Sequence, residues 1–242
     1  MTDSTPPMAL SGAALVIGAG GGIGAALVAQ LQASGAFAEV IALSRNTVPR
    51  LDYSDEASLQ AAAQQVAGQC VAAGQALRLM VVATGFLHGD AGQPERSFKN
   101  LDAAYLQQVF AINTLGPALV MKHFLPLLAK TGPAVAGFLS ARVGSMGDNA
   151  LGGWYGYRAS KAALNQLVKT ASIELTRGNK QSICVALHPG TVSTALSQPF
   201  AKTGLTVRPA AEAATDLLAV LHGLTLEQTG LLVDYKGVVL PF

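Results

Sequence analysis

The sequence predicts a single α/β domain in which a doubly wound parallel sheet carries helices on both faces. Short apolar runs alternate along the chain with longer segments of helical periodicity, as in strands joined by helical crossovers. The run at 77–85 is almost continuously apolar, which is typical of a strand covered on both sides. The 242 residues suffice for one large domain and contain no internal repeat or linker. We expect a loose tail over residues 1–12 and the domain over 13–242.

The first half of the chain alternates strand and helix. Residues 13–20 predict a strand that enters a glycine-rich turn, and 23–35 predict a helix that ends at Gly35. A second strand is expected at 38–45 and a third at 77–85. Between them, residues 53–70 predict a helix for which Ser54 is the expected N-cap.

The second half continues the same alternation. Residues 101–128 predict a long helical region with a bend near Gly116 and Pro117. Strands are expected at 133–141, 181–190 and 229–239. The helix expected at 155–178 has one apolar face, formed by Leu164, Leu167, Val168, Ala171 and Leu175.

The composition narrows the class of protein. Half of the residues are apolar and 12% are charged, which argues against disorder. A net charge of +2, with scattered Lys and Arg, gives no reason to expect nucleic acid or an acidic membrane as partner. No apolar run approaches the ~20 residues of a membrane span, and the first residues lack the layout of a secretion signal. Cys70 and Cys184 lie in apolar patterns, so we expect buried thiols and a cytoplasmic protein.

The glycine-rich turn predicts a dinucleotide site. Glycines allow the backbone to turn tightly and approach a diphosphate, and the following helix offers free N–H groups and a positive dipole end. A tight turn with no ligand is the alternative, but the flanking strand and helix favour binding in a Rossmann-type fold. The residues expected to contact the cofactor here are Gly18, Gly20, Gly22, Ile23 and Gly24.

Tyr157 and Lys161 lie four positions apart on the helix expected at 155–178, so their side chains point the same way. A free tyrosine has a pKa of about 10, and a nearby ammonium would lower it toward neutral pH. Tyr157 could then act as a general acid/base at neutral pH. The alternative is an ordinary exposed pair, in which the tyrosine ring packs and the lysine is solvated.

The turn spacing Gly-x-x-x-Gly-x-Gly, combined with Tyr157-x-x-x-Lys161, resembles the short-chain dehydrogenase/reductase family over nearly the whole chain. The stretches "GGWYGYRASKAALN" and "GDN" look most like the branch that contains the carbonyl reductase sniffer and the bacterial C-factor. The resemblance implies a carbonyl or secondary alcohol as substrate. It also implies pairing of the two long helices into a homodimer or homotetramer.

The resemblance assigns roles to further residues. Asn113 would distort its helix and anchor a water that relays protons to Lys161, which would also hold the nicotinamide ribose. Ala83, Thr84 and Gly85 stand where the family usually has Asn-Asn-Ala-Gly. The remaining implied cofactor contacts are Asp52 and Tyr53 near the adenine, and Pro189, Gly190, Val192 and Thr194 near the nicotinamide.

Ser44, Arg45 and Asn46 follow the second strand, where an acidic residue would favour NAD(H). Arg45 can direct two donors at a 2′-phosphate and Ser44 a third. An arginine that is merely solvated is the alternative. The missing carboxylate favours NADP(H) over NAD(H).

The family usually has a serine beside the tyrosine, as the second of a Ser-Ser pair. Here Ser140 occupies the first position, Ala141 the second, and Ser145 follows. Ser140 could reach the site through a twist or bulge of its strand, Ser145 could reach it through the loop, or a water could replace both. Strand alternation slightly favours Ser145. Hydrogen bonding at a strand end or turn is the alternative role of both serines.

The sequence therefore predicts an NADP(H)-dependent oxidoreductase in which Tyr157 is the general acid/base. The main alternative is a regulatory or signalling protein that binds NADP(H) without turnover, and a weaker one is an assembly protein that uses the fold as a scaffold. No His, Cys, Asp or Glu cluster has metal-ligand spacing, so no metal is expected. The substrate pocket is expected to be built largely from residues 193–207.

Overall fold

The computed structural model describes residues 10–90, 92–198 and 207–242. Its centre is a seven-stranded sheet in the order β2-β1-β3-β4-β5-β6-β7. The strands are β1 (Ala13–Ile17), β2 (Glu39–Leu43), β3 (Leu77–Val82), β4 (Ala134–Leu139), β5 (Ser182–His188), β6 (Leu232–Asp234) and β7 (Val239–Leu240). The predicted sheet is confirmed, except that the single strand expected at 229–239 is divided into two short strands, β6 and β7. Strand β7 pairs antiparallel with β6 because four residues form a turn and cannot make a parallel crossover.

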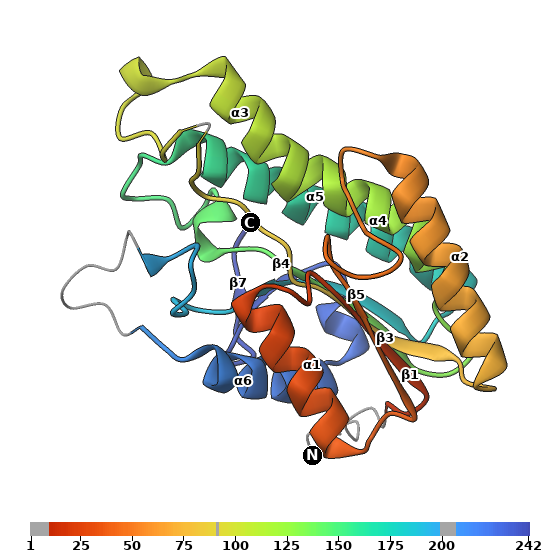
Figure 1. Ribbon diagram of the computed structural model, residues 1–242. Coiled ribbons are helices and arrows are strands. Elements are labelled where there is room, and N and C mark those ends of the chain that lie inside the picture. The colour runs from red at the N-terminus through yellow and green to blue at the C-terminus, as the bar shows by residue number, and fades with distance from the viewer. Residues whose placement is uncertain (1–9, 91, 199–206) are drawn as a thin grey trace, which may run out of the picture.

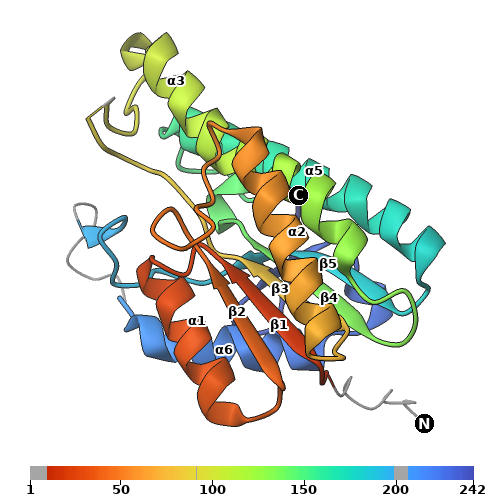
Figure 2. The same cartoon turned by 45° about the vertical axis from the view of Figure 1, so that its right-hand side comes forward.

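Helices cover both faces of the sheet (Figures 1 and 2). One face carries α1 (Gly22–Ser34) and α6 (Ala210–Gly223), and the other carries α2 (Glu56–Ala72), α4 (Gly116–Phe124) and α5 (Tyr155–Gly178). Helix α3 (Ala103–Phe110) packs along α5 and extends beyond the sheet. Short 3-10 turns occupy Phe98–Asn100, Leu125–Leu127, Arg142–Gly144 and Leu226–Gln228.

Strand alternation divides the core into two layers. In β1, Ala13, Leu15 and Ile17 belong to the layer beneath α2, α4 and α5, whereas Ala14 and Val16 belong to the layer with α1 and α6. All five side chains are fully buried. The two-sided burial explains why the strand sequences are apolar without interruption.

Two local predictions are corrected. Helix α2 begins one residue later than Ser54 would require, so Asp55 is the N-cap and accepts a hydrogen bond from the amide of Ala57. The Ser54 hydroxyl instead donates to Asp52. Leu10, which was expected in a loose tail, is buried in the core, while residues 1–9 lie outside the described part of the chain.

The expected bend between α3 and α4 is a π-helical turn at Ala111–Leu115. Pro117 has no N–H to bond the carbonyl of Asn113, so the regular α-helical ladder is interrupted here. Gly116 is required for a different reason. A Cβ atom at this position would lie 2.0 Å from the ring of Tyr53, which packs against the turn.

Helix α5 has the predicted bounds, but only part of its predicted apolar face enters the core. Leu164 and Val168 are buried, while Leu167, Ala171 and Leu175 are half-buried and line a surface groove beside α4. Cys70 and Cys184 are buried free thiols, as predicted. Across the described residues, no helix is long and apolar enough to cross a membrane.

Candidate active site

A cavity of about 590 Å³ opens at the carboxyl ends of β1, β2 and β3. The chain leaves β1 toward β2 on one side and returns to β3 on the other, and such a switch in strand order leaves a crevice for a ligand. The lining comes from the loops after these three strands and from the π-helical region. It comprises Gly18, Gly20, Gly21, Ser44, Arg45, Asn46, Leu51, Asp52, Tyr53, Ser54, Ala83, Thr84, Gly85, Phe86, Gln108, Ala111 and Ile112.

The glycine turn is built for close backbone contact. Gly18 has a φ of +89°, and a Cβ atom there would lie 2.9 Å from the carbonyl carbon of Ala83. A Cβ atom on Gly24 would lie 2.2 Å from the Gly18 oxygen, so helix α1 can start against the turn only with glycine there. Gly22 faces Thr194, whose methyl group would be 3.1 Å from an added Cβ. The turn therefore brings together the first loop and the distant segment after β5.

Polar side chains surround the cavity where β2 ends. Arg45 is exposed, and the hydroxyl of Ser44 accepts a hydrogen bond from the amide of Asn46. Asp52 accepts hydrogen bonds from the amide and hydroxyl of Ser54 and forms an ion pair with Arg50. These hydrogen bonds, together with the charges of Arg50 and Arg45, hold the pKa of Asp52 below its usual value. This end of the cavity thus carries two arginines.

The floor of the cavity is fixed by the segment after β3. The hydroxyl groups of Tyr53 and Thr84 are 2.9 Å apart and share a hydrogen bond. A Cβ atom on Gly85 would lie 3.9 Å from both the Asn113 side-chain oxygen and the Lys161 Nζ. The β3 loop, the π-helical turn and helix α5 therefore meet at Gly85.

Asn113 holds this junction together. It is fully buried, its side-chain oxygen accepts from the amide of Phe86 at 2.8 Å, and its nitrogen donates to the Phe86 carbonyl at 2.8 Å. The same nitrogen donates to the Ser160 hydroxyl at 3.1 Å. The side chain thus anchors the β3 loop to α5. Its predicted water relay remains a prediction.

Tyr157 and Lys161 lie in the first two turns of α5, with exposed fractions of 9% and 2%. The Lys161 Nζ is 5.8 Å from the centre of the Tyr157 ring and donates to the Leu139 carbonyl at 2.8 Å. The exposed pair considered as the alternative is therefore excluded. The Lys161 amine has no carboxylate partner among the described residues.

The expected lowering of the Tyr157 pKa by Lys161 is corrected by the structure. Burial raises the pKa of Tyr157 to about 12 and lowers the pKa of Lys161 to about 7. Removing water penalises the charged form of each group. An amine with a pKa near 7 is only partly charged at neutral pH, so it stabilises the phenolate weakly.

The two candidate serines are both buried and both engaged elsewhere. The Ser140 hydroxyl donates to the side-chain oxygen of Asn165 at 2.6 Å, and the Ser145 hydroxyl accepts from the amide of Asp148 at 3.0 Å. Neither is hydrogen-bonded to Tyr157 within the described residues. Ala141 follows β4 in extended conformation and is half-buried.

The segment after β5 lies close to the glycine turn and to Gly85, although none of its residues lines the cavity. Val192 is buried and its carbonyl accepts a hydrogen bond from Ser197, which also bonds the Thr194 amide. Gly190, which follows Pro189, has a φ of +77° and lies against Tyr235. The predicted substrate segment at 193–207 falls largely on residues 199–206, which lie outside the described residues.

Sequence reasoning missed several residues that line the cavity. Gly21, Leu51, Ser54 and Phe86 flank predicted residues and could have been found by proximity. Gln108, Ala111 and Ile112 left no such signal, because only the packing of α3 and the π-helical turn brings them to the cavity. Across the described ranges, no three His, Cys, Asp or Glu side chains are placed to hold a metal ion.

Comparisons with known proteins match this geometry. The family model for short chain dehydrogenases matches residues 12–204. C-signal of Myxococcus xanthus is 36% identical over 143 residues, which cover 59% of this chain and 82% of that protein. The 1-hydroxy-2-glutathionyl-2-methyl-3-butene dehydrogenase of Rhodococcus sp. is 34% identical over 143 residues, again 59% of this chain. The match spans 61% of that dehydrogenase, less than two thirds of its length.

Solved structures agree in fold along nearly the whole chain. An NADPH-bound carbonyl reductase from chicken fatty liver superposes with a TM-score of 0.78 at 25% identity, covering 98% of this chain and 100% of that one. The carbonyl reductase sniffer of D. melanogaster gives a TM-score of 0.75 at 21% identity, covering 97% and 100%, and this likeness concerns the fold alone. The family match, the sheet order and these relatives together establish that the chain belongs to the short-chain dehydrogenase family and is an oxidoreductase.

Proposed function

We propose that this oxidoreductase uses NADP(H) to interconvert a small carbonyl compound and its secondary alcohol, with Tyr157 as general acid/base. The observation that carries the proposal is the burial of Tyr157 and Lys161 together at the start of α5. There, Lys161 approaches Gly85 on the rim of the cavity behind the glycine turn. A water-poor site with one proton donor and one amine suits proton transfer to an oxygen.

The residues present fit a dinucleotide phosphate. The glycine turn leaves room for a diphosphate against the start of α1, which offers free N–H groups. At the end of β2, Arg45 and Ser44 face the cavity with no carboxylate at the matching position. Arg45 would hold a 2′-phosphate and Ser44 would assist it, which favours NADP(H) over NAD(H). The NADPH-bound carbonyl reductase that shares this fold supports the assignment.

Each residue of the pair has a separate task. A nicotinamide cofactor supplies hydride when bound, and its oxidised form brings a positive charge that favours the phenolate. Tyr157 donates its phenolic proton to the carbonyl oxygen in reduction and accepts it back in oxidation. Lys161 would hold the ribose hydroxyls, and a nearby anion such as the Tyr157 phenolate would favour the charged form of its amine.

The test is turnover of a carbonyl panel, followed by the change in absorbance of NADPH or NADH. We expect wild type to prefer NADPH, and Tyr157→Phe to lower kcat by ~10²-fold or more while the Kd for NADPH stays within about twofold. Tyr155→Phe is the matched control. Tyr155 is exposed and lies two residues before Tyr157, so this variant should retain activity. Full activity of Tyr157→Phe would refute the role of Tyr157. NADPH binding with no turnover by wild type would favour the regulatory alternative.

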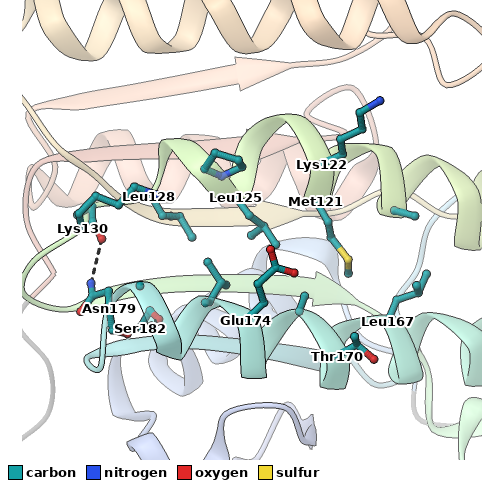
Figure 3. A pocket seen from close by; sticks show the side chains of 16 residues that line it. Met121, Lys122, Leu125, Leu128, Lys130, Leu167, Thr170, Glu174, Asn179 and Ser182 are labelled. Carbon is teal, nitrogen blue, oxygen red and sulfur yellow. Dashed lines mark hydrogen bonds between the residues drawn. The ribbon is translucent and has the colours of Figure 1, made fainter.

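We also propose that the chain forms a homodimer through the groove between α4 and α5. This groove has a volume of about 590 Å³ and half-buried apolar walls. Figure 3 shows Met121 and Leu125, from α4 and the 3-10 turn after it, and Glu174 of α5 pointing into the space between the helices. A second copy would bring the same apolar side chains, and the groove carries both a basic residue, Lys130, and an acidic one, Glu174, as a self-complementary interface can use.

A further inference from the structure

Helix α5 begins in an unusual way. The residue before it, Trp154, has a φ of 53°, in the left-handed region that non-glycine residues seldom adopt. Gly152 and Gly153 precede it with φ values of +64° and +66°. No side chain of its own caps the helix, and no acidic residue lies in its first turn. Such a conformation persists only where the surroundings enforce it.

Glu95 supplies what the helix lacks. This residue lies in the segment between β3 and the 3-10 turn at Phe98–Asn100, 61 positions before Gly156. Its carbonyl accepts from the amide of Trp154 at 2.5 Å, and its two carboxylate oxygens accept from the amide of Gly156 at 3.2 and 3.1 Å. One residue therefore binds the backbone on both sides of the helix start.

The Glu95 side chain is an acid in a buried position at the N-terminal end of α5. Its exposed fraction is 2%, yet it has no ion-pair partner among the described residues. Carboxylates are seldom buried without a cation. Here the positive end of the α5 dipole takes the place of a cation. Glycine at position 156 leaves room for the carboxylate, since an added Cβ would lie 3.0 Å from its Oε1 and 2.9 Å from the Leu106 side chain.

Glu95 is also linked to the reacting residue. Tyr157 directly follows Gly156, and the Trp154 ring packs edge-on against the Tyr157 ring, with their centres 6.1 Å apart. Tilting of the helix start or release of Trp154 would move the phenol. Misplacing a reacting group by ~1 Å can cost ~10²-fold in rate.

We propose that Glu95 is a positioning residue, which holds the start of α5 so that Tyr157 faces the substrate oxygen. This inference rests on the proposed function for the role of Tyr157. It assigns a task to a buried acid that is not part of the cavity lining and lies outside the Tyr157–Lys161 motif.

The test is Glu95→Gln, which keeps the shape and one acceptor oxygen but removes the charge. We expect kcat to fall ~10-fold or more with KM for both substrates within about twofold. Trp154 is the single tryptophan of the chain, so its fluorescence reports the helix start directly, and we expect its emission to shift. Glu95→Asp should recover part of kcat. Glu227→Gln is the matched control, because Glu227 is an exposed acid in the first turn of a different short helix and should leave both readouts unchanged.

The proposal requires both changes in Glu95→Gln, and a variant that shows only one of them, or neither, overturns it. Circular dichroism checks that the variant is folded. If it is not, Gly156→Ala provides the second test, because the added methyl displaces the carboxylate without altering charge and should give the same two changes. In wild type, the Gly156 amide should be protected from hydrogen exchange, and fast exchange there would overturn the proposal whatever the variants do.

These readouts separate the two proposals. A wild type that reduces no carbonyl would refute the proposed function. The emission of Trp154 and the exchange of the Gly156 amide need no turnover, so they would still decide whether Glu95 holds the start of α5.

Discussion

Tyr157 and Lys161 share one buried environment, and burial pushes both side chains toward their neutral forms. The pKa of the phenol rises to about 12 and that of the amine falls to about 7. At neutral pH the phenol is therefore protonated and the amine is only partly charged. The lowered pKa of Lys161 also has a measurable consequence for stability, because a pKa that differs between the folded and unfolded chain makes stability depend on pH.

Replacing Lys161 with Met should reveal this linkage. Between pH 7 and the ordinary lysine pKa of 10.5, the unfolded chain binds a proton that the folded chain does not, so the free energy of unfolding of wild type rises with pH. Below pH 7 Lys161 is protonated in both the folded and the unfolded chain, so the destabilisation by its buried charge no longer changes with pH. Lys161→Met lacks this dependence, so any stability advantage it has over wild type should shrink by roughly 1 kcal/mol per pH unit.

Urea unfolding of both proteins at pH 7, 8, 9 and 10 measures the difference. The raised pKa of Tyr157 does not interfere, because it lowers stability only above pH 10, where the unfolded tyrosine starts to ionise. A difference between the two proteins that stays constant over this range would mean that Lys161 keeps its ordinary pKa.

Ala141 occupies the position where the family has its serine, and this suggests a gain-of-function substitution. Ser140 points toward Asn165, so strand alternation directs the Ala141 side chain to the opposite side. We expect Ala141→Ser to add a hydrogen bond to the developing oxyanion and to raise kcat at least ~10-fold. Ala150→Ser, the same change at an exposed position, is the control.

Steady-state kinetics with the carbonyl compound of the panel that wild type reduces fastest measures this change in kcat. An unchanged kcat in Ala141→Ser would mean that the oxygen is already bound by another donor. Ser145→Ala would then show whether that donor is Ser145, since its hydroxyl accepts from the Asp148 amide and retains its proton for donation.

At the scale of elements, the π-helical turn shows why distortions are harder to predict than helices. In the sequence, Asn113, Gly116 and Pro117 indicated where the helix is distorted. It could not specify the type of distortion, because the turn is fixed by hydrogen bonds from Asn113 to Phe86, 27 positions earlier. The same applies to the α5 start, which depends on Glu95 rather than on neighbours in sequence.

Helix α5 illustrates the limit of periodicity in another way. Its bounds follow from the regular apolar spacing, and the structure confirms them. The spacing does not say what covers each apolar residue. Leu164 and Val168 are buried in the core, whereas Leu167, Ala171 and Leu175 are half-buried and line a surface groove.

At the scale of the whole molecule, the proposed dimer gives a direct prediction. Leu167→Glu places a charge in the apolar groove, where a partner helix would have to desolvate it. We expect dimer affinity to fall ~30-fold or more, corresponding to about 2 kcal/mol. Sedimentation velocity over a range of protein concentrations measures this change.

Val71→Glu is the matched control for that experiment, because Val71 is an exposed apolar residue on α2, away from the groove. It should leave the dimer intact. A wild type that sediments as a monomer at all concentrations, or a Leu167→Glu variant that dimerises as well as wild type, would contradict the assignment of the groove.

The sequence alone determined the order of strands and helices from β1 to β5, the glycine turn and the spacing of Tyr157 and Lys161, because these depend on local periodicity and on short stretches of chain. It did not predict helix α6 or the division of the last strand segment into β6 and β7. Tertiary structure alone decided which group Ser140 bonds, which acid caps α5 and which way the Tyr157 pKa moves. Those outcomes depend on contacts between residues far apart in the chain and on how completely the packed core excludes water.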